Sequence, residues 1–260
     1  MLILDRFSLK NKVAVLTGGA GGYGRQIAKA LAEAGARTYM ASRNINSLEQ
    51  CAEEYRKDGY DVTALQFDQG DEKTILELRD KIMKQAGRID VLVNNAVARP
   101  MSDFHDSAAA FAESMQINAT GLFLITRTLG DVMAQEGGGS IINIGSIHGM
   151  TGPHAARYRG TKVSGWWVDY FFHKGGMVNF TRFVASYYGR WGMRCNCVSP
   201  GGLYADGMEP IFVQQYNDRT FLGRLASETD LMGIIVFLAS DASLYITGTN
   251  IPVDGGYTAM

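Results

Sequence analysis

The sequence contains little cysteine, little proline and no long hydrophobic run. Its cysteines, Cys51, Cys195 and Cys197, are odd in number and lack the spacing of zinc ligands. The longest apolar run, at residues 233–239, is far too short to cross a bilayer, and Asp5 interrupts the N-terminal segment too early for a signal peptide. We therefore expect a cytoplasmic protein with reduced thiols, without a metal site or a membrane-spanning segment.

The chain also lacks an excess of charge of either sign. Lysine and arginine number 25 against 26 aspartates and glutamates, a formal net charge of −1, and no basic stripe stands out. This balance argues against a nucleic-acid partner. What the chain does have is glycine, 31 residues against only 5 prolines. Such a bias indicates many tight turns and close backbone approaches rather than disorder.

Short apolar runs alternate with segments of helical periodicity along the whole chain. The runs at 12–18, 37–42, 61–68, 89–96, 140–146, 193–200 and 249–256 predict strands. The segments at 24–36, 47–58, 74–87, 108–135 and 230–240, and a long one ending near 190, predict helices. Alternation of this kind indicates an α/β fold with a doubly wound, Rossmann-like parallel sheet. No repeat or linker divides residues 1–260, so we expect one domain.

The glycine-rich stretch TGGAGGYG, residues 17–24, joins the first strand to the first helix. Glycines there let the backbone approach a pyrophosphate, and the helix N-terminus offers unpaired N–H groups. The predicted phosphate contacts are Gly18, Gly22, Tyr23 and Gly24. An ordinary tight turn between strand and helix is the alternative, which the position directly after the first strand disfavours.

The end of the second strand distinguishes between two coenzymes. NAD sites usually place a carboxylate there, but this strand ends in Ser42 and Arg43. A guanidinium pairs well with a 2′-phosphate, and a serine adds a donor. The sequence favours NADP(H) and leaves NAD open, because Arg43 could also be a solvated charge.

In this order and spacing, the motifs resemble the short-chain dehydrogenase/reductase family over nearly the whole chain. They are TGGAGGYG, Asp68, NNA at 94–96, IN at 117–118, INIGS ending at Ser146, a Tyr-x-x-x-Lys, NCVSPGG at 196–202 and a C-terminal FLASDASLYITGTNIPVDGG. The resemblance implies the fold, hydride transfer with a nicotinamide coenzyme, and further coenzyme contacts at Asp68, Asn95, Ala96, Pro200 and Gly201. Asp68 could equally cap a turn. Two residues depart from the family pattern: Val97 replaces a glycine, and Ala205 falls where a threonine is usual.

Tyr-x-x-x-Lys occurs twice, as Tyr158 with Lys162 and as Tyr170 with Lys174. The interval from Ser146 fits Tyr158, whereas the stretch that follows Lys174 matches the family without a gap. Insertions are tolerated in loops and poorly inside helices. Residues 147–168 therefore read as an inserted lid near the active site, and Tyr170 with Lys174 as the catalytic pair.

On helix, the two side chains of that pair lie on one face. A neighbouring ammonium favours the phenolate, which suits Tyr170 to acid–base chemistry on an alcohol or ketone. Lys174 would tune the phenol and, like Tyr170, contact the coenzyme, and Ser146 would bind the reacting oxygen. By resemblance, Asn118 would hold a proton-relaying water; the alternative is an asparagine that bonds backbone.

Substrate contacts are the least constrained feature. His148 is either a pocket wall or a substrate donor. Arg99, Arg157 and Arg159 are either solvated charges or, if two converge, a site for a carboxylate or phosphate. Trp166 and Trp167 are either packing residues or a binding platform.

The residues favour an oxidoreductase for a small polar substrate, sugar-derived or a sugar acid, and the tail at 222–243 resembles gluconate 5-dehydrogenase-like members. The alternatives are a 3-oxoacyl thioester reductase and a catalytically silent nucleotide-binding scaffold. We also expect a homotetramer or homodimer, built partly through the C-terminal segment, that buries the aromatic residues of the helix after Lys174, namely Phe180, Phe183, Tyr187 and Tyr188. The alternative is that these aromatic residues line the core of the monomer.

Overall fold

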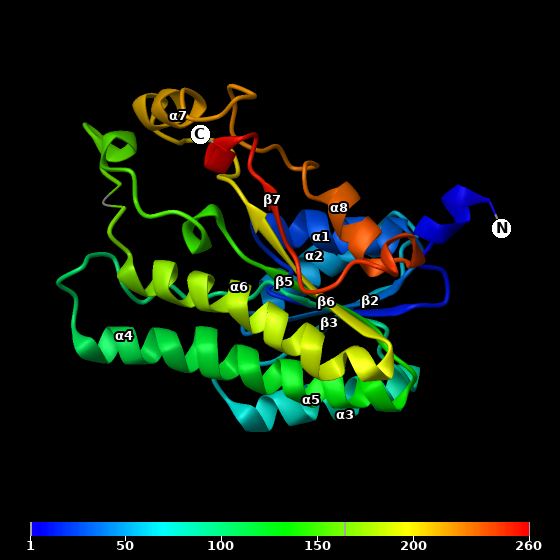
Figure 1. Cartoon of the computed structure of the whole chain (residues 1–260). Helices are drawn as coiled ribbons and strands as arrows, with labels where there is room; N and C mark the ends of the chain where they lie inside the picture. The colour runs from blue at the N-terminus through cyan, green and yellow to red at the C-terminus, as the bar shows by residue number, and fades with distance from the viewer. Residues whose placement is uncertain (1, 164, 260) are drawn as a thin grey trace.

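A single parallel sheet of seven strands organises the computed structural model, which describes residues 2–163 and 165–259 (Figure 1). The strand order is β3-β2-β1-β4-β5-β6-β7, and every neighbouring pair is parallel. The strands are β1 (Val13–Thr17), β2 (Arg37–Ser42), β3 (Val62–Gln66), β4 (Val91–Asn94), β5 (Gly139–Ile144), β6 (Met193–Pro200) and β7 (Asn250–Val253). The order changes direction between β1 and β4, and ligands of doubly wound sheets bind at such a switch point. The predicted fold class is confirmed.

Helices cover both faces of the sheet. One face carries α1 (Tyr23–Glu33), α2 (Ile45–Lys57) and α8 (Met232–Ala239). The other carries α3 (Glu72–Ala86), α5 (Leu122–Gln135) and α6 (Val168–Tyr188). Figure 1 shows α6 and α5 running side by side below the sheet. All the predicted strands and helices are present, with boundaries shifted by a few residues.

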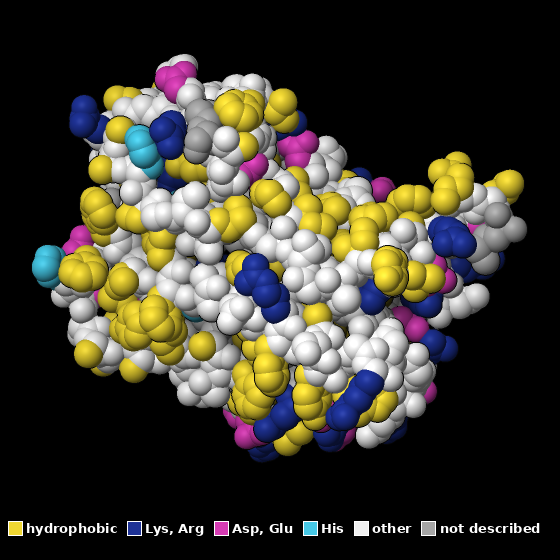
Figure 2. All heavy atoms as spheres, in the orientation of Figure 1, with side chains coloured by type: hydrophobic (Ala, Val, Ile, Leu, Met, Phe, Trp, Pro, Cys, Tyr) yellow, Lys and Arg dark blue, Asp and Glu magenta, His cyan; other side chains and the backbone are white. Residues whose placement is uncertain are grey.

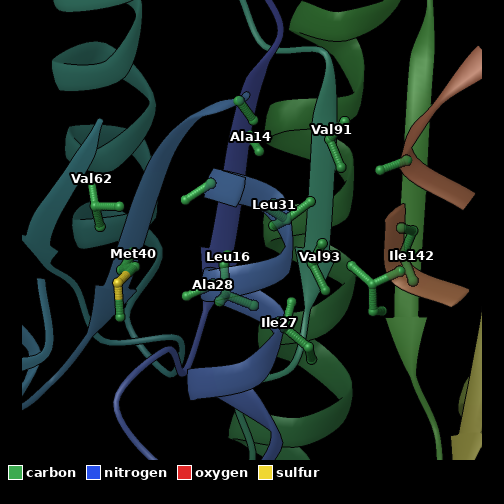
Figure 3. Close-up of a cluster of buried hydrophobic side chains, with 14 of the residues drawn as sticks. Ala14, Leu16, Ile27, Ala28, Leu31, Met40, Val62, Val91, Val93 and Ile142 are labelled. Atoms are coloured by element: carbon green, nitrogen blue, oxygen red, sulfur yellow. The ribbon is translucent and has the colours of Figure 1, made fainter. Parts of the chain in front are cut away.

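The core on the α1 side is built from alternate strand residues and one helix face. Figure 3 shows Leu16 of β1 and Val93 of β4 pointing toward Ile27 and Leu31 of α1. These four side chains are fully buried. The helical period that predicted α1 therefore marks the stripe that packs on the sheet, and this packing fixes the glycine-rich turn at the end of β1.

Two helical features were not predicted. The helix expected at 108–135 is interrupted between α4 (Ala108–Met115) and α5 by a π-helical turn, Gln116–Gly121. A further short helix, α7 (Pro210–Asn217), begins with a proline in its first turn, a position that proline tolerates. Only Tyr216 of α7 is buried, so the helix carries no apolar stripe long enough to reveal it in the sequence.

The segment between β5 and α6 is mostly irregular. It contains two short 3-10 turns, Ile147–Gly149 and Ala155–Tyr158, and α6 begins only at Val168. In Figure 1 this green segment rises from the sheet and lies beside α7 at the upper left. Its position next to α7 places it over the carboxyl ends of β5 and β6.

Hydrophobic side chains recur along the surface of α5 and α6 in Figure 2. Phe123, Phe183 and Tyr187 are among the exposed large apolar residues there. Tyr188 follows the alternative of a residue in the monomer core: it is 5% exposed, packs between α5 and α6, and donates a hydrogen bond to Asp131 at 2.7 Å. None of the described helices combines the length and apolarity that crossing a membrane requires.

Candidate active site

The glycine-rich turn brings backbone to within contact distance of the strand ends. Gly18 has φ +72°, and a Cβ there would lie 2.9 Å from the Cα of Ala96. A Cβ on Gly24 would collide with the carbonyl oxygen of Gly18. Around Gly22, which precedes α1 with φ +47°, the space is open. Glycine is thus required for the turn, and the N-terminus of α1 faces open space, which fits a bound phosphate.

Two of the predicted coenzyme residues also hold this turn in place. Asn95 donates its side-chain amide to the carbonyl oxygens of Thr17 and Gly18, at 3.1 and 2.7 Å. The phenol of Tyr23 donates to the carbonyl oxygen of Gly201 at 2.9 Å. Burial raises the pKa of Tyr23 well above its usual value, so it stays a donor. The turn is thereby tied to β4 and to the loop after β6, where Pro200 and Gly201 border the same cavity.

A cavity of about 310 Å³ lies at the end of β2 and is lined by Ser42, Arg43 and Asp68. Arg43 is exposed and, within the described part of the chain, makes no ion pair. The Ser42 hydroxyl donates to the Asn44 carbonyl at 3.3 Å, and Asp68 accepts from the Gly70 N–H at 2.9 Å. Asp68 therefore does cap a turn, while Arg43 keeps its donors available at the cavity wall.

Tyr170 and Lys174 lie one turn apart near the start of α6. The Lys174 ammonium lies 5.7 Å from the centre of the Tyr170 ring and donates to the Ile144 carbonyl at 2.6 Å. Lys174 is 3% exposed. Ser146 follows β5 directly and is buried, within hydrogen-bonding reach of the Tyr170 phenol. The three side chains meet where β5 and α6 face the cavity.

Charge decides the ionisation of this tyrosine. Burial raises the pKa of Tyr170, but Lys174 and Arg99 act in the opposite direction and are helped by hydrogen bonds from Ser146 and Arg99. The net effect is a pKa below the usual value for tyrosine. The Arg99 guanidinium lies over the ring, with Cζ 4.6 Å from its centre. Burial also lowers the pKa of Lys174, against the attraction of Tyr170.

Asn118 lies in the π-helical turn, and its side-chain amide makes three hydrogen bonds. It donates to the Ala98 carbonyl at 2.8 Å and to Ser114 Oγ at 3.0 Å, and it accepts from the Ala98 N–H at 2.9 Å. Ser114 in turn donates to buried Asp169 at 2.6 Å. The side chain thus clamps the loop after β4 to the helix.

The two Tyr-x-x-x-Lys sequences lie in different structures. Tyr158 ends a 3-10 turn and is buried, whereas Lys162 is exposed in the loop that follows. The Lys162 backbone N–H donates to Glu209, and its side chain is not among the cavity-lining residues. Of the two pairs, Tyr170 with Lys174 is the one whose residues share a helix and both line the cavity.

A cavity of about 860 Å³ joins the glycine turn to the Tyr170 region. Arg99, His148 and Arg157 all line it. Arg157 is 3% exposed, so it is not the solvated charge that a lid arginine usually is. Arg159, two residues on, is exposed. Val97 lines the cavity with 40% of its side chain exposed, and Ala205 is exposed in the loop before α7.

Sequence reasoning missed most of the wall opposite the glycine turn. Met208 before α7, and Phe212 and Tyr216 of α7, line the cavity and were not predicted, whereas Trp167, for which the sequence left packing or a binding platform open, lines it as well. Trp167 lies edge-on to Tyr158, with ring centres 6.1 Å apart. The aromatic composition of 209–217 was the available signal. That composition does not identify a cavity wall by itself, because the wall forms only where α7 packs against residues 155–158.

Comparisons with known proteins agree on the architecture. A family model described as enoyl-(acyl carrier protein) reductase matches residues 18–258. The 7α-hydroxysteroid dehydrogenase of Bacteroides fragilis is 32% identical over 98% of this chain and 96% of its own length. The gluconate 5-dehydrogenase of Gluconobacter oxydans is 30% identical over 98% and 97%.

A solved structure is similar over its full length. The gluconate 5-dehydrogenase of Burkholderia cenocepacia, in complex with NADP and tartrate, has a TM-score of 0.88 and 28% identity, covering 100% of both chains. These relatives share an oxidoreductase scaffold that acts on alcohols and ketones, and they differ in substrate.

Proposed function

The chain belongs to the short-chain dehydrogenase/reductase family, an oxidoreductase family that binds NAD(P), and we propose that it is an NADP(H)-dependent enzyme interconverting a secondary alcohol and a ketone. The substrate would be small and polar, sugar-derived or a sugar acid. One observation carries this proposal: Ser146, Tyr170 and Lys174 meet at the wall of a cavity that continues to the glycine turn.

The residues of this chain fit a nicotinamide coenzyme. Gly18 and Gly24 leave no room for a Cβ, so backbone N–H groups can approach a pyrophosphate. Arg43, at the wall of both cavities, suits a 2′-phosphate. When bound, the coenzyme donates or accepts a hydride. NADP(H) is favoured by Arg43 and by the NADP of the Burkholderia cenocepacia structure; NAD remains the alternative coenzyme.

Proton transfer falls to Tyr170. In the direction of reduction, its phenol donates a proton to the oxygen on which alkoxide charge develops; in oxidation, its phenolate accepts the proton of the alcohol. Lys174 and Arg99 stabilise the phenolate electrostatically. Ser146 orients the reacting oxygen. Asn118 supports this arrangement by fixing the loop that carries Arg99, through its bonds with Ala98.

The substrate class follows from the polar cavity wall. Arg99, His148 and Arg157 favour a polar or acidic molecule over the long alkyl chain of a 3-oxoacyl thioester. The apolar wall formed by Trp167 and Phe212 is the feature that favours the thioester reductase as second candidate. A silent scaffold is disfavoured because the serine, tyrosine and lysine set is complete.

We further propose a homotetramer or homodimer in the cytoplasm. Exposed Phe123, Phe183 and Tyr187 lie along α5 and α6, where an apolar contact with a second copy would cover them. The three cysteines are buried and unpaired, which suits a reducing compartment. Light scattering after size exclusion measures the assembly directly; a mass near 28.4 kDa at micromolar protein would contradict it.

The test of the function is a panel of alcohols and ketones with both coenzymes, followed by absorbance of the reduced nicotinamide. Hydroxy acids, sugars, steroids and a 3-oxoacyl thioester represent the candidate classes. We expect turnover of a small hydroxy or oxo acid with NADP(H) above NAD(H). Turnover of the thioester alone would support the second candidate, and coenzyme binding without turnover would support the scaffold.

A further inference from the structure

Arg157 is a buried cation without a buried anion. It is 3% exposed, and no aspartate or glutamate of the described chain lies within ion-pair distance of it. Its Nε has no hydrogen-bond partner among the described residues. An arginine stays charged in a protein, and a buried charge is costly unless it is paired. The missing partner is therefore expected from outside the chain.

Neutral groups position this guanidinium. Nη1 donates to the Tyr257 hydroxyl and Nη2 to His148 Nε2, each at 3.1 Å. The rings of Tyr158 and Tyr216 lie 4.4 and 5.4 Å from its Cζ. Burial, followed by the charges of Arg157 and Arg99, lowers the pKa of His148 to about 3, so its imidazole is neutral and can accept. The guanidinium is held by hydrogen bonds and aromatic faces, but its charge is not neutralised.

We propose that Arg157 binds a carboxylate of the substrate within the cavity that holds Tyr170. The inference rests on the proposed function, since it assigns the substrate's acidic group to one residue of that site. Nε is enclosed by the protein, and each terminal nitrogen has one N–H engaged, which leaves one N–H on each for a bidentate contact with a carboxylate. A carboxylate brings one negative charge to match one positive charge. A phosphate dianion would need a second cation beside Arg157, whereas the Arg99 guanidinium lies over the Tyr170 ring.

His148 lies between Arg157, the proposed carboxylate site, and Tyr170, the proposed proton donor. It is hydrogen-bonded to Arg157, and its ring centre lies 6.0 Å from that of Tyr170. The carboxylate at Arg157 and the reacting carbon at Tyr170 would thus lie on either side of His148. This spacing favours a hydroxy acid whose reacting alcohol lies several carbons from the carboxylate over a 2-hydroxy acid, in which the two groups are adjacent.

The competing interpretation is structural. The stacking of Arg157 on Tyr158 and Tyr216 could serve only to fasten the lid to α7, with cation–π contacts compensating part of the charge. The two interpretations differ in one respect: a fastening residue does not distinguish an acid from its neutral counterpart.

The experiment is a calorimetric titration of the full-length chain, with and without NADP⁺, using tartrate, gluconate, inorganic phosphate and threitol. Threitol is tartrate with both carboxylates replaced by alcohols. We expect tartrate or gluconate to bind, phosphate and threitol to bind at least tenfold more weakly, and Arg157→Met to weaken carboxylate binding at least tenfold without changing threitol. Arg159→Met is the matched control, because it removes an exposed arginine from the same segment, and should leave all four titrations unchanged.

Arg157→Lys and Tyr257→Phe protect the test against misfolding. The lysine keeps the charge but loses the planar fork, and the phenylalanine removes one bond that positions Arg157; both should weaken carboxylate binding by a smaller factor than Arg157→Met. Failure of tartrate and gluconate to bind, phosphate binding that exceeds theirs, or unchanged carboxylate binding in all three variants would each overturn the inference. Arg157-dependent binding without turnover on any carbonyl compound would leave it standing and refute the proposed function instead.

Discussion

Tyr158 with Lys162 and Tyr170 with Lys174 have the same spacing in the sequence and different structures. On α6 the spacing places an ammonium beside a phenol, and both line the cavity. In the lid the chain is irregular, so Tyr158 turns into the cavity wall while Lys162 is exposed. A four-residue spacing between tyrosine and lysine therefore indicates a catalytic pair only where the segment is helical, because only a helix brings the two side chains together.

The largest expected difference between the two Tyr-x-x-x-Lys pairs is in turnover after the phenol hydroxyl of each is removed. We expect Tyr170→Phe to lower turnover on the order of 10²- to 10⁴-fold, the range of general acid–base catalysis, while coenzyme affinity stays nearly intact. Steady-state rates and a fluorescence titration with NADPH give the two values. Tyr158→Phe is the matched control and should stay within a few-fold of the unmodified enzyme. If Tyr158→Phe were the inactive variant, the assignment of residues 147–168 as the insertion would be wrong.

The next largest expected effect is on coenzyme selectivity, which we assign to Arg43 rather than to either Tyr-x-x-x-Lys pair. Arg43→Ala removes a charge-assisted contact that contributes roughly 1.5–3 kcal/mol, or about ten- to hundred-fold in affinity. The loss should fall on NADP(H) alone, because only this coenzyme carries the 2′-phosphate. Dissociation constants for both coenzymes measure it. Equal affinity of the unmodified protein for NADP and NAD would contradict the assignment of Arg43.

The pH dependence of alcohol oxidation gives a third test of the role of Tyr170. Oxidation needs the phenolate, so its rate should rise as pH increases through the lowered pKa of Tyr170. Arg99→Leu removes one of the two cations that stabilise the phenolate, and the rise should move to higher pH. Rates of alcohol oxidation across pH, at saturating coenzyme, give the midpoint. A midpoint that stays in place would mean that Arg99 does not act on Tyr170.

Stability should show the smallest effect. The Tyr158 hydroxyl is buried and has no hydrogen-bond partner among the described residues. Since removing it deletes an unsatisfied polar group, Tyr158→Phe should change the free energy of unfolding by less than about 1 kcal/mol and could raise it. Urea denaturation of the unmodified protein and of Tyr158→Phe measures the difference in the free energy of unfolding. A loss of several kcal/mol would reveal a bond of the hydroxyl that the structure does not show.

The sequence predicted the sheet, its helices and the glycine turn because local periodicity and turn chemistry determine them. The burial of Arg157 and the α7 wall depend on contacts between residues 155–158, 210–217 and 257–259, which no local pattern reports. The sequence left Tyr188 either at an interface or in the monomer core, where it lies, for the same reason: an aromatic stripe on α6 does not say which part of it faces α5. The rule that insertions avoid helix interiors placed Tyr170 and Lys174 on one helix, where the structure has them.

The central claim is that Tyr170, and not Tyr158, is the tyrosine tuned for proton transfer, and its ionisation can be measured without any substrate. Tyrosinate absorbance followed across pH in the native protein should show one phenol that titrates below the usual value for tyrosine. We predict that this early phase disappears in Tyr170→Phe and persists in Tyr158→Phe. An early phase that survives in Tyr170→Phe, or that disappears in Tyr158→Phe, would contradict the account.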